Sequence, residues 1–250
     1  MVNQSYVALT DIIPGASTTG LTSFDGLTER NLMDKLEILQ GADPTNPRSF
    51  VWEFLRYSDY LVHATEAFEG QVLIDLGCGR SVDGYIFAKI AGAKAYIGND
   101  HIHLPSLYEK LNSEDRQGDK ELTGFIEGMK KFLQKDRQTF VYNPKILSGI
   151  IDRMDKHLAG NFDIPYTLVP EDMKDFLKRI PDNSVSVFAS GIDMDIISQD
   201  MYAYEIESEI TRVVSPSGAF ISYKSRLDPK GLVKDLKYSQ EHTFEKYVKK

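Results

Sequence analysis

Five short apolar runs, each separated from the next by a stretch of helical character, constrain the fold of this 250-residue chain more than any other feature. Runs of four or five apolar residues have the length of a buried strand. Continuous apolar strands that alternate with helices are typical of a parallel sheet covered on both faces. The predicted fold is therefore α/β, an open, doubly wound and mostly parallel sheet. The predicted strands are Val72–Leu76, Ala95–Gly98, Tyr166–Val169, Val185–Ala189 and Ala219–Tyr223.

The residues outside this alternation predict two further regions. Residues 1–69 are expected to form an N-terminal arm and a helical cap, with helices at about 31–40 and 47–68. Residues 70–250 form the main domain, with a charge-neutral helical insertion at about 104–164 that is expected to be a satellite subdomain. Near the C-terminus, a helix at about 230–238 and a strand at 244–248 are predicted.

Composition excludes several classes of protein. Hydrophobic residues make up 42% of the chain, which is enough for a full core and excludes global disorder. No run approaches the roughly 18 apolar residues that span a bilayer, and the first residues do not resemble a secretory signal. The single cysteine, Cys78, excludes an internal disulfide. We therefore expect a cytoplasmic protein without a membrane partner; the sequence gives no oligomeric state.

Charge argues against a generic nucleic-acid partner, because the net charge is −8 and such partners favour a basic surface. Six acids and no Lys or Arg lie between Asp193 and Glu209. This segment has two interpretations: it attracts a cationic substrate, or it is a solvated helix face.

The clearest motif is Asp75-Leu-Gly77-Cys-Gly79, which follows a predicted strand and precedes a helix. Glycines at such a turn let the backbone approach a ligand, although they also occur for packing reasons. Asp100 lies 21 residues after Gly79, at the end of the next strand, where an acid can hold ribose hydroxyls or simply cap a helix. Val82 replaces the third glycine of dinucleotide-binding turns, and no Gly-x-x-x-x-Gly-Lys motif is present. A nucleoside without a pyrophosphate therefore fits better than NAD or ATP.

With these residues the sequence resembles the class I S-adenosylmethionine-dependent methyltransferases. The glycine turn is similar to their first motif, and Asp100 matches their ribose-binding acid. The segments 170–184, 190–193 and 209–221 are similar to those around their fourth and fifth strands. The resemblance implies a Rossmann-like methyltransferase fold and S-adenosylmethionine as cofactor. It implies that the cofactor is bound by Asp75, Gly77, Cys78, Gly79, Asp100, His101, Asp172, Met173 and Ser190.

The resemblance also assigns roles to these positions. Gly77 and Gly79 would cradle the amino-acid part of the cofactor, and Asp75 would orient their turn and favour the ammonium group. Asp100 would bind the ribose, whereas Asp172 and Met173 would contact the adenine. His101 would pack near the adenine, Cys78 would pack under the turn, and Ser190 would lie toward the methyl group.

The sequence departs from the family at several points. Arg80-Ser81 replaces the usual Ser-Gly or Thr-Gly, with Gly84 as the expected source of the missing flexibility. The insertion is unusually long, and the terminal antiparallel hairpin is expected to be short. No Asn-Pro-Pro-Tyr motif is present, which weakens an interpretation as a DNA-adenine methyltransferase.

No residue is firmly nominated as a catalytic base; the candidates are Asp193, Tyr202 and Tyr204. A metal site at Asp100, His101 and His103 is disfavoured, because no further Cys or His lies in the neighbouring motifs.

The functional hypothesis is methyl transfer to a small molecule, with an amine among the candidates. The N-terminal helices and the insertion are expected to shape the acceptor pocket. A protein acceptor stays open. The alternatives are a non-catalytic binding module of the same fold and, less favoured, a nicotinamide-dependent oxidoreductase.

Overall fold

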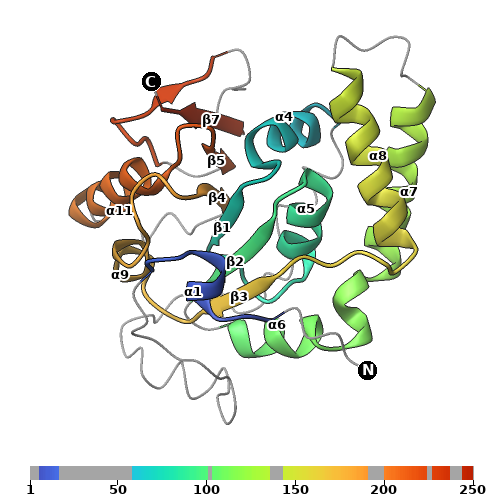
Figure 1. Ribbon diagram of the computed structural model, residues 1–250, viewed down its shortest axis with the longest axis horizontal. Helices are drawn as coiled ribbons and strands as arrows, with labels where there is room; N and C mark the ends of the chain where they lie inside the picture. Colours follow the sequence, from blue (N-terminus) through green and yellow to red (C-terminus); the bar gives the residue numbers. More distant parts are fainter. Residues whose placement is uncertain are drawn as a thin grey trace.

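A seven-stranded sheet forms the centre of the protein, with the strand order β3-β2-β1-β4-β5-β7-β6 (Figure 1). The first five strands are parallel, whereas β7 is antiparallel to both of its neighbours. The strands are β1 (Val72–Leu76), β2 (Ala95–Asn99), β3 (Tyr166–Val169), β4 (Ser186–Ser190), β5 (Ala219–Tyr223), β6 (Val233–Lys234) and β7 (Phe244–Val248). The computed structural model describes residues 6–16, 58–100, 103–135, 143–190, 200–223, 227–236 and 244–249. All five predicted parallel strands and the predicted α/β fold are confirmed.

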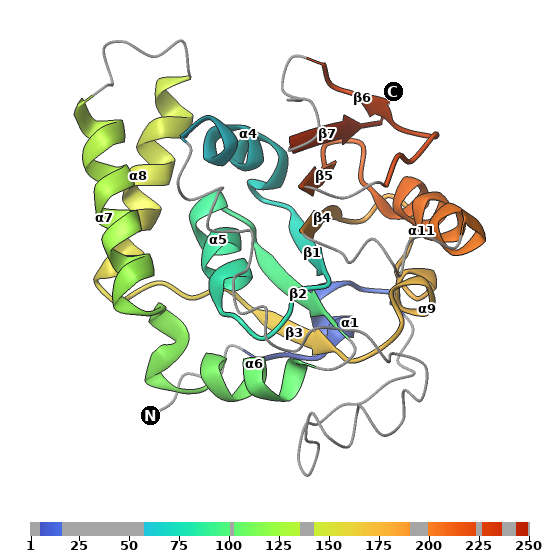
Figure 2. The same ribbon diagram turned by 180° about the vertical axis from the view of Figure 1, so that it is seen from behind.

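Helices cover both faces of the sheet (Figures 1 and 2). Side chains of a strand point alternately to the two faces, so that Leu73 belongs to one hydrophobic core and Val72 to the other. The first core is covered by α4 (Ser58–Phe68), α5 (Asp83–Ala91), α6 (Leu104–Leu111), α7 (Lys120–Lys135) and α8 (Pro144–Leu158). The second is covered by α1 (Leu9–Ile12), α9 (Met173–Lys178) and α11 (Asp200–Val213). Within the described ranges, no helix is both long enough and apolar enough to cross a membrane.

The registers of the parallel strands bring their carboxyl ends to one edge of the sheet. Leu76 at the end of β1 lies opposite Asn99 of β2 and Ala189 of β4. Asn99 in turn lies opposite Val169 of β3. The glycine turn after β1 and the segments that follow β2, β3 and β4 therefore start side by side, which is where ligands bind in open α/β sheets.

The helical insertion is part of the main body rather than a satellite subdomain, which corrects the prediction. The helix α8 packs against α5 and α4, and α7 lies beside α8 (Figures 1 and 2). The apolar residues of both helices belong to the first core. The Arg153 side chain donates to the carbonyl of Ile90 (2.7 Å) and contacts Glu69 (3.0 Å). Lys89, which is fully buried, contacts Asp163 (3.2 Å) after α8. These contacts lie at the end of α5 remote from the glycine turn, so a role of α7 and α8 in an acceptor pocket stays a prediction.

Part of the predicted N-terminal arm extends the sheet. Tyr6 forms a parallel bridge with Tyr166, and the Val7 amide donates to the Tyr166 carbonyl (2.9 Å). The chain then enters α1, whose apolar side chains join the second core. Of the predicted cap, α4 (Ser58–Phe68) confirms the last part of the second helix; the first helix and residues 47–57 lie outside the described residues.

The prediction of a helix at about 230–238 is wrong for its described part. Residues 230–231 form a turn closed by the Leu232 amide on the Pro229 carbonyl (3.0 Å), and β6 then pairs with β7. Pairing along an existing strand satisfies backbone groups at once, whereas a helix of this length gains little by itself. Because β6 has two residues, the terminal hairpin is short, as expected.

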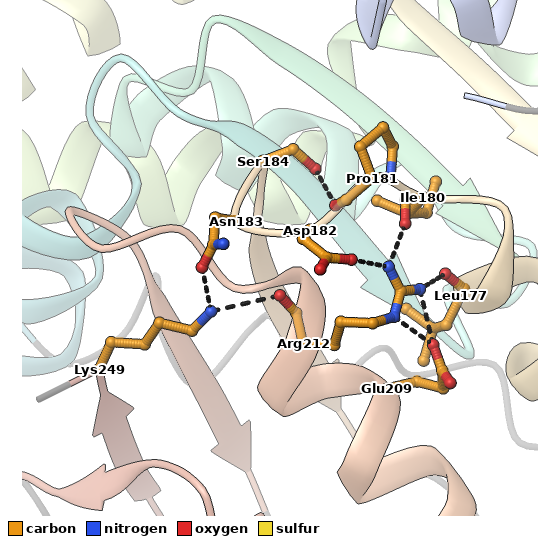
Figure 3. Close-up of polar contacts among 9 residues, drawn as sticks. All are labelled: Leu177, Ile180, Pro181, Asp182, Asn183, Ser184, Glu209, Arg212 and Lys249. Atoms are coloured by element: carbon orange, nitrogen blue, oxygen red, sulfur yellow. Dashed lines mark hydrogen bonds and ion pairs between the residues drawn. The ribbon is translucent and has the colours of Figure 1, made fainter. Parts of the chain in front are cut away.

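Arg212 of α11 joins this helix to the short helix α9 on the second face (Figure 3). Its guanidinium donates to the carbonyls of Leu177 (2.8 Å) and Ile180 (2.7 Å) at the end of α9. It also pairs with the carboxylates of Asp182 and Glu209 (both 2.6 Å). One side chain therefore caps α9 and fixes it to α11.

Candidate functional site

The glycine turn after β1 is held against the end of β2. Gly77 and Gly79 have φ angles of 68° and 65°, which side-chain-bearing residues rarely adopt. The amides of Gly77 and Cys78 donate to the Asn99 carbonyl (2.9 and 3.1 Å). A Cβ at Gly79 would meet no atom within 4 Å, so the backbone faces open space there. The turn therefore has the shape expected of a cradle that lets a ligand approach the main chain.

Asp100 connects this turn to the next helix. One carboxylate oxygen accepts from the Gly79 amide (3.1 Å), and the other accepts from the amide of His103, the N-cap residue of α6 (3.0 Å). The side chain thus bridges the glycine turn and the residue that precedes α6, without being the N-cap residue of that helix. The predicted proximity of Asp100 to the glycines is confirmed.

Asp75 lies beneath the turn, buried between β1 and α5. Its carboxylate accepts from the Tyr96 hydroxyl (2.9 Å), and no cation partners it among the described residues. Burial, with the nearby charge of Asp100, raises the pKa of Asp75 to about 7, although the bond from Tyr96 acts to lower it. The site therefore contains an acid whose charge is not compensated by the protein.

Gly84 supplies space for this acid, and not the flexibility expected from the sequence. Its φ angle is not among the positive ones, but a Cβ there would lie 2.2 Å from the Asp75 Oδ2 atom. Any side chain at this position would displace the carboxylate.

Cys78 packs under the turn, as expected. Its side chain is buried, and a Cβ on Gly98 would lie 3.0 Å from its Sγ atom. Burial, together with Asp75 and Asp100, raises the pKa of the thiol, which disfavours the nucleophilic thiolate.

Asp172 is the N-cap residue of α9. Its Oδ1 atom accepts from the amides of Lys174 (2.9 Å) and Asp175 (3.4 Å), and Oδ2 accepts from the Tyr202 hydroxyl (2.6 Å). Met173, the first residue of the helix, is buried in the second core. The carboxylate predicted to contact an adenine is therefore fixed by groups from two helices.

The structure describes two of the three catalytic candidates, Tyr202 and Tyr204. Tyr202 donates to Asp172, and burial together with that carboxylate raises its pKa, which disfavours a role as a base at neutral pH. Tyr204 is 68% exposed on α11. Asp193 and the cofactor candidate His101 lie outside the described residues. Ser190 ends β4 at the same edge of the sheet as the turn.

The described part of the acidic segment is mostly paired within the protein. Glu205 contacts Lys174 (2.9 Å), Glu209 contacts Arg212, and Glu207 accepts from the Asp228 amide (2.7 Å). These pairs favour the interpretation of α11 as a helix face over that of a cation-attracting surface. Within the described ranges, no group of three His, Cys, Asp or Glu side chains is arranged to hold a metal ion.

The sequence analysis missed two residues of β2 that support the site, Tyr96 and Asn99. Both are fully buried in β2, where Tyr96 bonds Asp75 and the Asn99 amide donates to the carbonyls of Val169 and Glu171 (both 2.9 Å). The available signal was an amide at the end of an apolar strand, since a buried amide requires partners.

Comparisons with known proteins find only solved structures of low sequence identity and low TM-score. The sequence matches no protein-family model and no curated protein. An rRNA methyltransferase from Streptomyces viridochromogenes is 12% identical, covering 77% of this chain and 84% of its own, with a TM-score of 0.41. A TehB-like SAM-dependent methyltransferase from Corynebacterium glutamicum is 14% identical, covering 89% and 98%, with a TM-score of 0.41. A putative RNA methyltransferase from Pyrococcus horikoshii is 15% identical, covering 88% and 94%, with a TM-score of 0.38.

At TM-scores below 0.5 these similarities assign neither a ligand nor an activity to this chain. The fold assignment comes from the sheet itself. Five parallel strands with helices on both faces, closed by a short antiparallel hairpin, form the Rossmann-like methyltransferase fold that the sequence resembles.

Proposed function

We propose that this protein transfers a methyl group from S-adenosylmethionine to a small acceptor. The observation that supports this most is the carboxyl edge of the sheet. There, a glycine turn with open space beside Gly79 adjoins an uncompensated acid, Asp75, and the Asp100 carboxylate of the next strand. Such a combination suits a ligand with a cationic amino-acid part and a ribose.

The proposed roles follow the positions of the residues. The turn at Gly77 and Gly79 would receive the amino-acid part, with Asp75 beneath it to balance the ammonium charge. Asp100 would receive the ribose hydroxyls, and the start of α9 at Asp172 and Met173 would meet the adenine. Cys78, His101 and Ser190 would complete the surroundings of the ligand.

When bound, the cofactor supplies an activated methyl group on a sulfonium. The contribution of the chain is then to align the acceptor and to exclude water, which can lower a barrier by several kcal/mol, on the order of 7–11 in the best intramolecular cases. The segment after β4, which carries Asp193 and Asp195, is proposed to face the acceptor. An amine is the first acceptor class to test, because the sequence from Asp193 to Glu209 carries six acids and no Lys or Arg, and a cationic acceptor is attracted by such a charge.

Calorimetric titration with S-adenosylmethionine and S-adenosylhomocysteine tests the proposal. We expect both to bind the wild-type protein, and Asp100→Ala to weaken binding about tenfold or more, since bonds to a charged group contribute about 1.5–3 kcal/mol. Asp119→Ala is the matched control, because Asp119 likewise accepts an amide at a helix start, that of Leu122 (2.8 Å), away from the site.

Absence of binding by either ligand would contradict the proposal. A change of less than about fivefold in Asp100→Ala would remove Asp100 from the ribose role, since that ratio is below about 1 kcal/mol. Formation of S-adenosylhomocysteine is then measured with a panel of small amines. Tight binding without turnover on any acceptor would favour the non-catalytic binding module instead.

A further inference from the structure

Asn99 is the last residue of β2 and lies between the segments proposed to contact the ligand. Its side chain is fully buried, in a strand that is otherwise built from apolar residues, Tyr and Gly. Burial of an amide costs free energy unless its groups are bonded, so a buried amide at this point requires an explanation.

The side-chain amide nitrogen holds the loop between β3 and α9. It donates to the carbonyls of Val169 and Glu171, each at 2.9 Å. The Glu171 amide also donates to the Val169 carbonyl (3.0 Å), closing a tight turn around Pro170. The next residue, Asp172, begins α9. Two bonds from one amide therefore fix the loop that presents Asp172 and Met173.

The other polar groups of this corner face the glycine turn. The Asn99 carbonyl accepts the amides of Gly77 and Cys78, and the following residue, Asp100, accepts the amide of Gly79. The side-chain oxygen Oδ1 is buried and has no hydrogen-bond partner in the part of the chain that the structure describes. Within that part, the amide nitrogen carries the polar bonds of this side chain, and both go to the β3–α9 loop.

We propose that Asn99 is a positioning residue for base recognition. Its side chain fixes the loop that carries Asp172 and Met173 at a set distance from Asp100 and from the glycine turn. This inference rests on the proposed function, because the ligand is what spans these segments. Loss of the amide is expected to loosen contacts to the base. The proposed ribose contact is expected to be retained, because the amides of Gly79 and His103 hold the Asp100 carboxylate in place.

The experiment compares two selectivity ratios by calorimetry. Base selectivity is the affinity for S-adenosylhomocysteine relative to S-inosylhomocysteine, which lacks the 6-amino group. Ribose selectivity is the affinity for S-adenosylhomocysteine relative to its 2′-deoxy analogue. For Asn99→Leu, which keeps the branched shape of the side chain but has no donor, we expect base selectivity to fall about tenfold and ribose selectivity to stay within twofold of wild type.

Ser186→Ala is the matched control. Ser186 is also fully buried and bonds two backbone groups, the carbonyl of Ala67 (3.1 Å) and the amide of Ala219 (3.2 Å), away from the carboxyl edge. Its loss should lower the melting temperature and leave both ratios unchanged. If Asn99→Leu does not fold, Asn99→Asp serves, because a protonated carboxyl can donate one of the two bonds and should give an intermediate base selectivity.

Each outcome has a distinct meaning. Unchanged base selectivity in both Asn99 variants, with only a lower melting temperature, would overturn the proposal and leave the proposed function intact. Equal loss of both ratios would also overturn it, because the effect would not be confined to the base. A wild-type protein that binds S-adenosylhomocysteine without base selectivity would exclude Asp172 and Met173 as base contacts, and with them this role of Asn99. Absence of any wild-type binding would be a failure of the proposed function itself.

Discussion

At the scale of single residues, Asp75 is an acid in an environment very different from water. Its carboxyl is buried, accepts one bond from Tyr96 and faces the acid Asp100 and the thiol of Cys78. Burial and the charge of Asp100 disfavour the charged form of Asp75, whereas the bond from the Tyr96 hydroxyl favours it. The net effect is that the folded protein holds the proton more tightly than the unfolded chain does.

This arrangement predicts how stability depends on pH. Because the pKa of Asp75 is raised to about 7, its contribution is full below about pH 4 and is lost as the pH rises through 7. Asp75→Asn should remove this dependence, on the order of 4 kcal/mol across that interval. Urea unfolding of both proteins between pH 4 and 8 measures it. Parallel stability curves for the variant and the wild type would show that Asp75 titrates normally.

The residues of the site were predictable to different degrees. Asp75, Gly77, Gly79 and Asp100 follow from local spacing, because the turn and the strand ends are set by the chain on either side of them. The bond between Tyr96 and Asp75 was not predictable, since it depends on the register that puts Leu73 opposite Tyr96 and Asp75 opposite Gly98. The bond between Tyr202 and Asp172 likewise depends on how α11 packs on α9.

At the scale of elements, the junction of α9 and α11 depends on one guanidinium (Figure 3). Arg212 donates to the carbonyls of Leu177 and Ile180 at the end of α9, and it pairs with two acids. A planar group with five donors can reach all four acceptors at once, whereas a lysine ammonium cannot.

Arg212→Met should therefore lower the free energy of unfolding by about 2–3 kcal/mol, and Arg212→Lys should recover only part of it. Chemical denaturation measures both. Lys230→Met is the control: Lys230 pairs with Asp228 at an exposed position, where such pairs contribute about 0–1 kcal/mol. Equal effects of the lysine and methionine variants at position 212 would mean that the charge and geometry of the guanidinium are unimportant there.

At the scale of the whole molecule, the helical insertion and the sheet share one hydrophobic core. Ile150 and Met154 of α8 belong to the same buried cluster as Leu73 of β1 and Ile86 of α5. Removal of α8 from α5 would also leave the buried Lys89 without its partner Asp163, which is costly in an apolar environment.

We therefore expect the insertion to unfold together with the sheet. In native-state hydrogen exchange, the central amides of α8 should have opening free energies within about 1 kcal/mol of those in β1. A much lower value for α8, with β1 still protected, would indicate that the insertion opens as a separate unit. The amides of 114–117, a single 3₁₀ turn, should exchange faster than both and serve as the reference for local opening.

The sequence by itself determined the elements and their class. Apolar runs, helical periodicity and glycine turns are local properties, so five strands, their helices and the α/β fold could be derived from them. Only the tertiary structure decided how the insertion packs, that residues 230–234 form a turn and a strand, and that Gly84 provides space for Asp75. The physical reason is that these outcomes depend on partners distant in the chain: a neighbouring strand, a buried counter-charge, or a carboxylate on another element.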